Sequence, residues 1–242
     1  MSDAVTAVVK ELAPNGTLRV GINLSNFLLV TGKTVSGDPV GVAPDMGAQI
    51  AQRLGVPFSY VTFAAPGPLA DEVDKGIWDI GLIGAEPQRA EKIHFTSAYV
   101  EIQSTFLVPP GSPVQTIDDV DKPGVRIACT ARTAYGLWLE RNIKHATIVW
   151  TDTLDNSFDK FAADKLDALA GLKPKLLSEV KRMPGARILD GQFSAVQQAV
   201  GTSRKNAAAQ AWLEAFVAEA KASGFVERLI SKHKVVGLNV AP

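Results

Sequence analysis

Short apolar segments rich in β-branched and aromatic residues alternate along the chain with longer amphipathic stretches. Residues 44–54 show the helical pattern, because Pro44 stands near the first turn and Met46, Ile50 and Leu54 recur at intervals of four. The apolar run at 58–62, which follows, has the length and composition of a strand. Regular alternation of this kind predicts an α/β fold with largely parallel sheets.

The alternation falls into two similar series. The first has predicted strands at 18–21, 58–62 and 80–83 and helices at 44–54 and about 68–75; the second has strands at 126–129, 148–150 and 167–170 and helices at 133–143, 155–163 and 173–183. Strands at 102–108 and 195–200 lead from one series into the other, and residues 207–233 are helical with a break at Ser223-Gly224. We therefore predict two α/β lobes joined by two crossover strands, with lobe 1 formed by residues 1–108 and 200–242 and lobe 2 by residues 109–199.

A fold of this kind offers one obvious place for a ligand. The carboxyl ends of parallel strands and the N-termini of helices meet at crevices, which are the usual ligand sites of such folds. We therefore expect a small-molecule site in the cleft between the two lobes.

Composition excludes several other classes of function. Lysine plus arginine equals aspartate plus glutamate at 25 each, so no net positive field favours nucleic acid or an anionic membrane. The chain has one cysteine, which excludes an internal disulfide, and its three histidines are scattered without metal-ligand spacing. We expect a monomer without metal or cofactor.

Several motifs carry a resemblance to a known family. They are Gly16-Thr-Leu-Arg-Val-Gly21, Val40-Gly-Val-Ala-Pro-Asp-Met46, Gly76-Ile-Trp-Asp79, and Pro87-Gln-Arg89 followed by His94-Phe-Thr-Ser-Ala-Tyr99. With these motifs in order along essentially the whole chain, the sequence resembles the type II periplasmic solute-binding proteins of family 3, which serve amino-acid ABC transporters. The resemblance implies the two-lobed type II fold, hinge closure around a small ligand, an ABC transporter permease as partner, and a periplasmic location.

The first ten residues bear on that location. They have no basic n-region, no long apolar core and no cleavage site. Two interpretations remain open: a periplasmic protein whose signal peptide is absent from this sequence, or a cytoplasmic protein.

In lobe 1 the resemblance assigns the ligand's carboxylate to Arg89, whose planar guanidinium suits a bidentate carboxylate pair. The alternative is an exposed arginine paired with Glu86. Backbone groups of Gly84 and Ala85 would hydrogen-bond the ligand, and Glu86 would hold an ammonium group or only neutralise Arg89.

In lobe 2 the family places backbone donors at a helix N-terminus, here Thr133 and Ala134, where the helix dipole favours an anion. Arg132 replaces the family's glycine and would add an anionic anchor or point to solvent. The family's aspartate for an α-amino group is replaced by Leu172, followed by Lys173. This departure questions an ordinary amino-acid ligand, because Lys173 would suit an organic acid or dicarboxylate, if it is not simply solvated.

Four further contacts are predicted at the cleft. Asn26 and Pro66 stand where the family has an aromatic wall, and Phe27 or Phe63 would compensate from adjacent positions. Asn23 and Asn26 would make this wall more polar, and Gln197 lies on the returning crossover strand. A buried hydrogen-bonding role near the hinge is the alternative for the polar members of this group.

The predicted function is the solute-binding component of an ABC transporter, which captures an amino acid or related organic acid and is not an enzyme. Two alternatives remain: a cyclohexadienyl or arogenate dehydratase on the same scaffold, with Glu86 as general acid, and a ligand-sensing domain.

Overall fold

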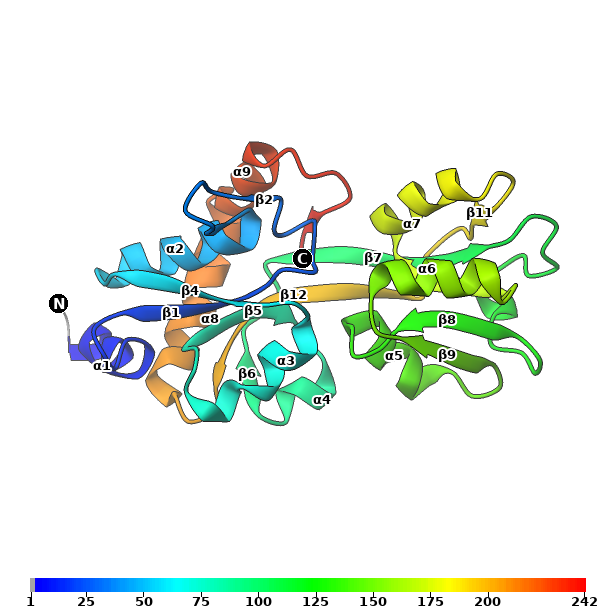
Figure 1. The fold of residues 1–242 in the computed structure, drawn as a ribbon. Coiled ribbons are helices and arrows are strands. Elements are labelled where there is room, and N and C mark those ends of the chain that lie inside the picture. The colour runs from blue at the N-terminus through cyan, green and yellow to red at the C-terminus, as the bar shows by residue number, and fades with distance from the viewer. Residues whose placement is uncertain (1–2) are drawn as a thin grey trace. The chain divides into compact units, whose positions relative to one another are not determined.

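A computed structural model describes residues 3–242 of the chain (Figure 1), which divide into two compact units. Unit 1 contains residues 1–101 and 197–242, and unit 2 contains residues 102–196. The chain passes between them within β7 (Val100–Val108) and within β12 (Ser194–Ser203). Each unit is an α/β domain, and the fold class predicted from the alternating pattern is confirmed.

Unit 1 is built on a mainly parallel sheet with the strand order β4-β1-β5-β12. Its elements are α1 (Asp3–Leu12), β1 (Leu18–Asn23), the hairpin of β2 (Gly32–Lys33) and β3 (Pro39–Val40), α2 (Val42–Leu54), β4 (Phe58–Phe63), α3 (Pro66–Asp71), the 3₁₀ helix η1 (Val73–Lys75), β5 (Ile80–Gly84), α4 (Pro87–Ala90), β6 (Ile93–Phe95), α8 (Ala207–Ala222), α9 (Phe225–Lys232) and β13 (Asn239–Val240). Strand β1 pairs in parallel with β4 and β5, whereas β12 returns antiparallel to β5. The carboxyl ends of β1 and β5 therefore lie at one edge of the sheet.

Helices cover both faces of this sheet (Figure 1). On one face α2 packs so closely that a Cβ atom at Gly47 would stand 2.5 Å from Val20. On the opposite face, where the neighbouring residue Gly21 points, Leu69 of α3 and Trp78 pack against the strands. Val20 and Gly21 are neighbours in β1 and therefore point to opposite faces of the sheet, so α2 packs on one face and α3 on the other.

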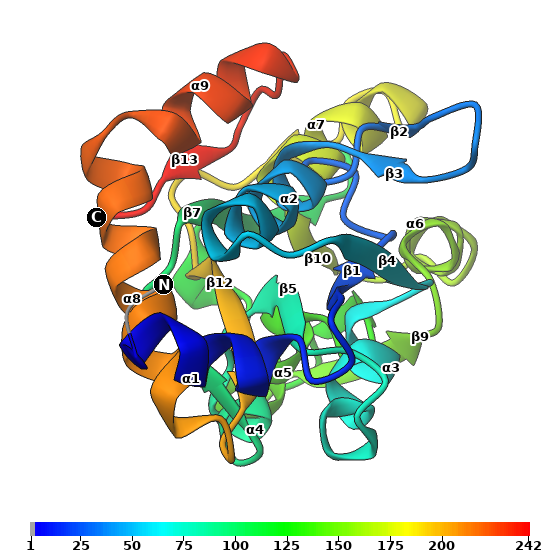
Figure 2. The ribbon, with the colours of Figure 1, turned by 90° about the vertical axis from the view of Figure 1, so that its left-hand side faces the viewer.

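The N-terminal helix is fixed to the rest of unit 1 by a capping interaction. Helix α1 lies beside α8 (Figure 2), and the Glu11 carboxylate accepts hydrogen bonds from the N–H groups of Ala208 at 3.3 Å and Ala209 at 2.8 Å. A carboxylate at a helix N-terminus satisfies free backbone donors and complements the helix dipole. The side chain of Asn206, the N-cap residue of α8, makes no capping hydrogen bond, and the Glu11 carboxylate takes over this role.

Unit 2 has the strand order β7-β10-β8-β9, in which β8 is parallel to both β10 and β9. Its remaining elements are the 3₁₀ helix η2 (Ile117–Asp119), β8 (Arg126–Thr130), α5 (Ala134–Asn142), β9 (Thr147–Thr151), α6 (Leu154–Ala163), β10 (Ala168–Leu172), α7 (Lys173–Glu179), the 3₁₀ helix η3 (Val180–Arg182) and β11 (Arg187–Ile188). The carboxyl ends of β10, β8 and β9 therefore share one edge, and each is followed by a helix.

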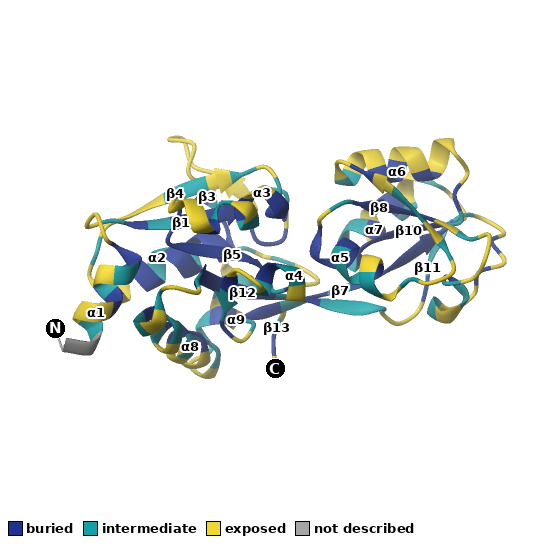
Figure 3. Ribbon diagram, turned by 90° about the horizontal axis from the view of Figure 1, so that it is seen from below, coloured by how far each residue is buried: buried dark blue, intermediate teal, exposed yellow. Residues whose placement is uncertain are grey.

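The core of unit 2 lies between its sheet and the helices α6 and α7. Phe158 and Phe161 of α6 pack with Leu176 of α7 on Ala128 and Leu169 of the sheet. Strands β8 and β10 are largely buried, while the outer faces of the helices are exposed (Figure 3). This is the amphipathic arrangement that the sequence pattern predicts.

Most predicted elements are present, and two helices end earlier than predicted. The helix predicted at about 68–75 is α3 followed by η1, and the helix predicted at 173–183 is α7 followed by η3. In both cases the chain tightens into a 3₁₀ turn, as the i→i−3 bonds from Glu72 to Leu69 and from Met183 to Val180 show. Helices α1 and α4, the β2–β3 hairpin and the short strand β13 were not predicted.

Candidate functional site

In unit 1 the predicted anion-binding residue Arg89 lies beyond the carboxyl end of β5. Its side chain is buried, at 6% exposure, so the alternative of an exposed arginine is wrong. Its Nη1 donates a hydrogen bond to the carbonyl oxygen of Gly84 at 2.8 Å, which holds the guanidinium over the end of the strand. An arginine remains charged even when buried, and its fork of donors matches a carboxylate. This cation therefore has the chemistry of an anion site.

The short segment between β5 and α4 determines how Arg89 is placed. Glu86 precedes Pro87 and α4, its side chain is buried, and its carbonyl accepts the N–H of Arg89 at 2.9 Å. The N–H of Ala85 donates to the carbonyl of Gln197 at 2.7 Å, so this predicted ligand donor is already used by the sheet. This bond fixes the loop to β12, and the charged groups of the loop are the side chains of Glu86 and Arg89.

The polar residues after β1 lie at the same sheet edge. The Asn23 side-chain oxygen accepts from the N–H of Ser25 at 3.1 Å, and that of Asn26 accepts from the N–H of Leu28 at 3.2 Å. Both amides therefore shape the turn. Phe27, which follows Asn26, is 39% exposed, so its side chain is the accessible part of this segment. Gln197, on β12, donates from its side chain to Glu101 at 3.0 Å.

In unit 2 the predicted N-terminus of α5 has the expected cap. The Thr133 hydroxyl accepts the N–H of Gly136 at 3.1 Å and donates to the carbonyl of Thr130 at 2.9 Å. Ala134 is the first residue of the helix and is buried. Arg132, immediately before the cap, is exposed and has a φ of 59°. Arg132 therefore adopts the left-handed backbone conformation although it has a side chain.

A buried cluster of hydroxyl groups at the ends of β8 and β9 was not predicted from the sequence. Ser157 of α6 lies 2.7 Å from the Thr130 hydroxyl and also bonds the Thr151 hydroxyl, and all three residues are buried. These bonds tie the ends of β8 and β9 to the first turn of α6. A sequence signal existed: a threonine ends each strand, and a second threonine, Thr133 or Thr153, caps each following helix.

Leu172 and Lys173 stand at the end of β10. The Leu172 side chain is 9% exposed, and Lys173 is the half-buried first residue of α7. Among the described residues no carboxylate pairs with the Lys173 ammonium, whereas the next lysine along, Lys175, pairs with Asp155 and Glu179. The edge of the unit 2 sheet therefore presents Lys173 as a cation without a protein counter-ion.

Burial also suppresses ionisation around α5. It raises the pKa of the Tyr135 phenol, and it raises the pKa of the Cys129 thiol, so both groups are neutral at physiological pH. Neither group supplies charge to a ligand.

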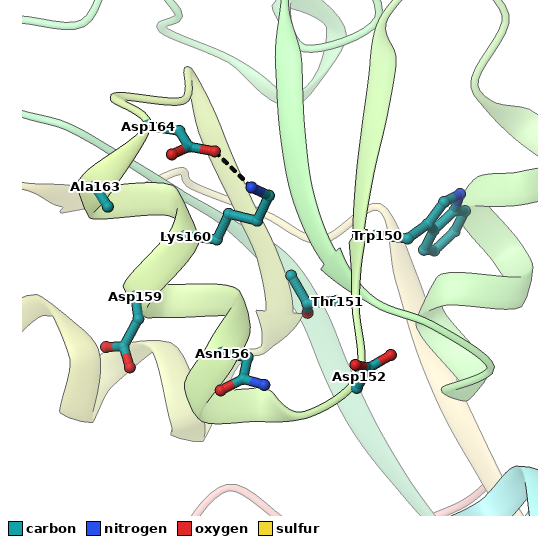
Figure 4. A pocket seen from close by; sticks show the side chains of 8 residues that line it. All are labelled: Trp150, Thr151, Asp152, Asn156, Asp159, Lys160, Ala163 and Asp164. Atoms are coloured by element: carbon teal, nitrogen blue, oxygen red, sulfur yellow. Dashed lines mark hydrogen bonds and ion pairs between the residues drawn. The ribbon is translucent and has the colours of Figure 1, made fainter.

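A separate hollow lies between the end of β9 and α6 (Figure 4). It is lined by residues such as Trp150, Asp152 and Asn156, and its Lys160 and Asp164 pair with each other at 2.6 Å. None of the predicted ligand-binding residues line it. Across residues 3–242, no three His, Cys, Asp or Glu side chains gather to hold a metal ion, and no helix is both long and apolar enough to cross a membrane.

Comparison with known families gives the decisive result. A family model described as bacterial extracellular solute-binding proteins, family 3, matches residues 18–235. The chain belongs to this family. Family 3 consists mostly of non-catalytic binding proteins, and the resemblance seen in the sequence motifs is confirmed. No curated protein sequence matches the chain.

Solved structures of family 3 relatives share the fold. The ancestral amino-acid-binding protein AncCDT-1, a precursor of cyclohexadienyl dehydratase, has a TM-score of 0.73 and 21% identity, covering 93% of this chain and 98% of its own. A binding component of an ABC transporter from Wolinella succinogenes, complexed with lysine, has a TM-score of 0.74 and 20% identity over 90% and 95% of the two chains. The substrate-binding protein AbpA from Streptococcus pneumoniae, bound to L-arginine, has a TM-score of 0.73 and 17% identity over 93% and 98%. These likenesses show the type II fold.

Proposed function

We propose that this chain is the solute-binding component of an ABC transporter that captures a small carboxylate-bearing ligand, an amino acid or related organic acid, in the cleft between its two lobes. Arg89 binds the carboxylate, and groups of unit 2, led by the N-terminus of α5, complete the cage. The ligand stabilises the closed arrangement because only that arrangement lets both lobes contact it.

The observation that carries this proposal is the burial of Arg89. This guanidinium, at 6% exposure, is a buried cation that its bond to the Gly84 carbonyl holds over the end of β5, and its fork of donors matches a carboxylate. Family membership supports the transport role, and the relatives complexed with lysine and arginine support ligands that carry a carboxylate. The family's extracellular character supports a periplasmic location and a membrane permease as partner.

A thermal-shift screen tests this function. Protein stripped of ligand by unfolding and refolding is heated with a panel of amino acids, monocarboxylates and dicarboxylates. A ligand at about a hundred times its dissociation constant adds about 2.7 kcal/mol to the free energy of unfolding. We expect at least one acid to raise the melting temperature of the wild type and of Arg204→Met, but not of Arg89→Met.

Arg204 is the matched control because it is an exposed arginine of unit 1 that also bonds a carbonyl, that of Ala90 at 2.5 Å. No shift with any acid, or equal shifts in both variants, contradicts the proposed site.

One observation favours the dehydratase as a second candidate. The carboxyl group of Glu86 is buried close in sequence to Arg89, and one structural neighbour is a precursor of cyclohexadienyl dehydratase. Turnover of prephenate that disappears in Glu86→Gln would favour the enzyme. Binding of prephenate without turnover, or no binding, would favour transport.

A further inference from the structure

The sheet of unit 2 ends in a strand that has a neighbour on one side only. Among the described residues, β9 pairs residue for residue with β8 and with no other strand, and it lies at the margin of unit 2 (Figure 1). Natural proteins usually protect such an edge with a charge, a proline or a bulge within the strand. The sequence of β9, Thr-Ile-Val-Trp-Thr, has no charged residue and no proline. The edge of β9 is therefore open to another strand.

The backbone of β9 presents two residues toward this open side. The N–H of Thr147 donates to a carbonyl just before β8 at 2.8 Å, and the carbonyl of Thr151 accepts an N–H from just after β8 at 2.9 Å. The backbone groups of successive residues point in alternate directions along a strand. The N–H and C=O groups of Ile148 and Trp150 therefore point away from β8, toward the open side.

The side chains of β9 also divide between two faces. Val149 lies opposite Ala128 and packs on the core that α6 and α7 cover. Ile148 and Trp150 belong to the other face, and Figure 4 shows the Trp150 side chain pointing away from α6. Trp150 is 41% exposed and is the largest exposed hydrophobic side chain among the described residues. This edge thus offers an apolar contact beside its backbone donors and acceptors.

The edge is complementary to a second copy of itself. When two β9 strands run antiparallel with Val149 opposite Val149, Ile148 of one copy lies opposite Trp150 of the other. Both residues direct their backbone outward, so they exchange N–H···O=C bonds, and the two-fold axis repeats this exchange. The same register packs the Trp150 side chain of each copy beside Ile148 of the other.

The charges at the two ends of β9 favour the same partner. Lys144 and His145 precede the strand, and Asp152 follows it directly. The antiparallel register brings Asp152 of each copy to the end where Lys144 and His145 of the other copy stand. Among the described residues, no cation pairs with the Asp152 carboxylate, and the Lys144 ammonium donates to a backbone carbonyl, that of Arg141 at 2.5 Å. Both charges are therefore available to a second copy.

We infer that β9 is a self-association surface, on which a second copy of this chain pairs antiparallel through Ile148 and Trp150. The outer strand of the unit 1 sheet, β4, is not equivalent. No charged residue stands between Arg53 and Asp71, so the two ends of β4 offer a second copy no opposite charges.

A seam of this length is small, so the dimer is weak and depends on the protein concentration. None of the predicted ligand-binding residues lies on β9, so the inference does not rest on the proposed function. It revises the monomer expected from the sequence, because the sequence does not show that this strand is the outer one of its sheet.

Sedimentation velocity over a range of protein concentrations tests the dimer. The wild type should move from the sedimentation coefficient of a monomer toward that of a dimer as the concentration rises. Trp150→Lys should remain monomeric, because a lysine on an edge strand keeps its charge in water and opposes pairing. Phe58→Lys is the matched control, since Phe58 lies on β4 and is also 41% exposed, and it should behave as the wild type. Far-ultraviolet circular dichroism checks that both variants fold.

A disulfide at the two-fold axis tests the register. In the proposed pair the Cα atoms of the two Val149 residues are about 4.5 Å apart, within the range that a disulfide spans. Val149→Cys should therefore give a disulfide-linked dimer under mild oxidation, while the buried Cys129 stays unreacted. Thr147→Cys is the control, because Thr147 lies opposite Thr151 in this register and the two copies of residue 147 are about 13 Å apart.

A charge exchange tests the role of the strand ends. Asp152→Lys or Lys144→Asp alone should weaken the dimer by roughly tenfold, since the two-fold axis repeats the lost ion pair. The double variant, Asp152→Lys with Lys144→Asp, restores opposite charges and should regain most of the wild-type association.

The outcomes decide for or against this surface. Sedimentation of the wild type as a monomer at every concentration overturns the inference, as does a dimer that persists in Trp150→Lys. Disulfide formation in Thr147→Cys that equals or exceeds that in Val149→Cys contradicts the register. Thermal shifts with acids should be the same in Trp150→Lys and in the wild type, so the proposed function is tested separately.

Discussion

The N-cap of α5 gives the sharpest stability prediction, because Thr133 and Thr153 cap successive helices of unit 2 with different side-chain bonds. The Thr133 hydroxyl accepts from Gly136 and also donates to the Thr130 carbonyl, whereas the Thr153 hydroxyl only accepts from Asn156, at 3.1 Å. Loss of a cap costs about 1 kcal/mol, and loss of a further hydrogen bond about 1 kcal/mol more. Thr133→Ala should therefore lower the free energy of unfolding by about 2 kcal/mol, and Thr153→Ala by about 1 kcal/mol.

Urea unfolding followed by far-ultraviolet circular dichroism measures both values. Thr133→Ser retains the hydroxyl and should recover most of the loss, which separates the hydrogen bonds from the loss of the methyl group. If Thr133→Ala costs no more than Thr153→Ala, or if the serine variant is as unstable as the alanine variant, the assignment of two bonds to Thr133 is wrong.

Three further predictions concern other parts of the fold. Burial alone would raise the pKa of Asp121, but hydrogen bonds from the N–H groups of residues 144–146 lower it from 3.8 to about 2. The contribution of the Asp121 carboxylate to stability is therefore full above pH 3.8 and is lost as the pH falls toward 2. In acid titrations the stability difference between wild type and Asp121→Asn should shrink over that interval, and a constant difference would contradict this. Asp79 is buried and accepts three hydrogen bonds from Arg19, so Asp79→Ala should cost about 3 kcal/mol in urea unfolding, and a cost below about 1 kcal/mol would refute the pairing. Cys129 is fully buried with a raised thiol pKa, so a disulfide reagent should label it only on unfolding; fast labelling of the native protein would exclude this environment.

The sequence predicted the fold well because period and composition act locally. The helix at 44–54 is marked by apolar residues at intervals of four, and the strand at 80–83 by a short apolar run of strand length. Helix α4 escaped prediction because four residues cannot show a helical period, although they carry Arg89. Helix α1 has a regular amphipathic pattern, but its packing against α8 depends on Glu11 reaching a helix distant in sequence.

The candidate site was predictable only in part. The motif identified Arg89, but its burial and its bond to Gly84 depend on how β5 meets α4. Nothing in the sequence indicates that the N–H of Ala85 is taken by β12, because that bond joins segments more than a hundred residues apart. The half-buried state of Lys173 likewise depends on packing, and the residue type alone favoured solvation.

The most direct test of the central claim is a distance measurement between the units, with and without ligand. Spin labels are introduced through Lys10→Cys in unit 1 and Lys181→Cys in unit 2, both at exposed positions, and the buried Cys129 stays unlabelled. The ligand is the acid that gives the largest thermal shift. A solute-binding protein that closes on a carboxylate predicts a shift of the distance distribution in the wild type and no shift in Arg89→Met. A distribution that is unchanged when this acid is bound to the wild type would contradict the claim.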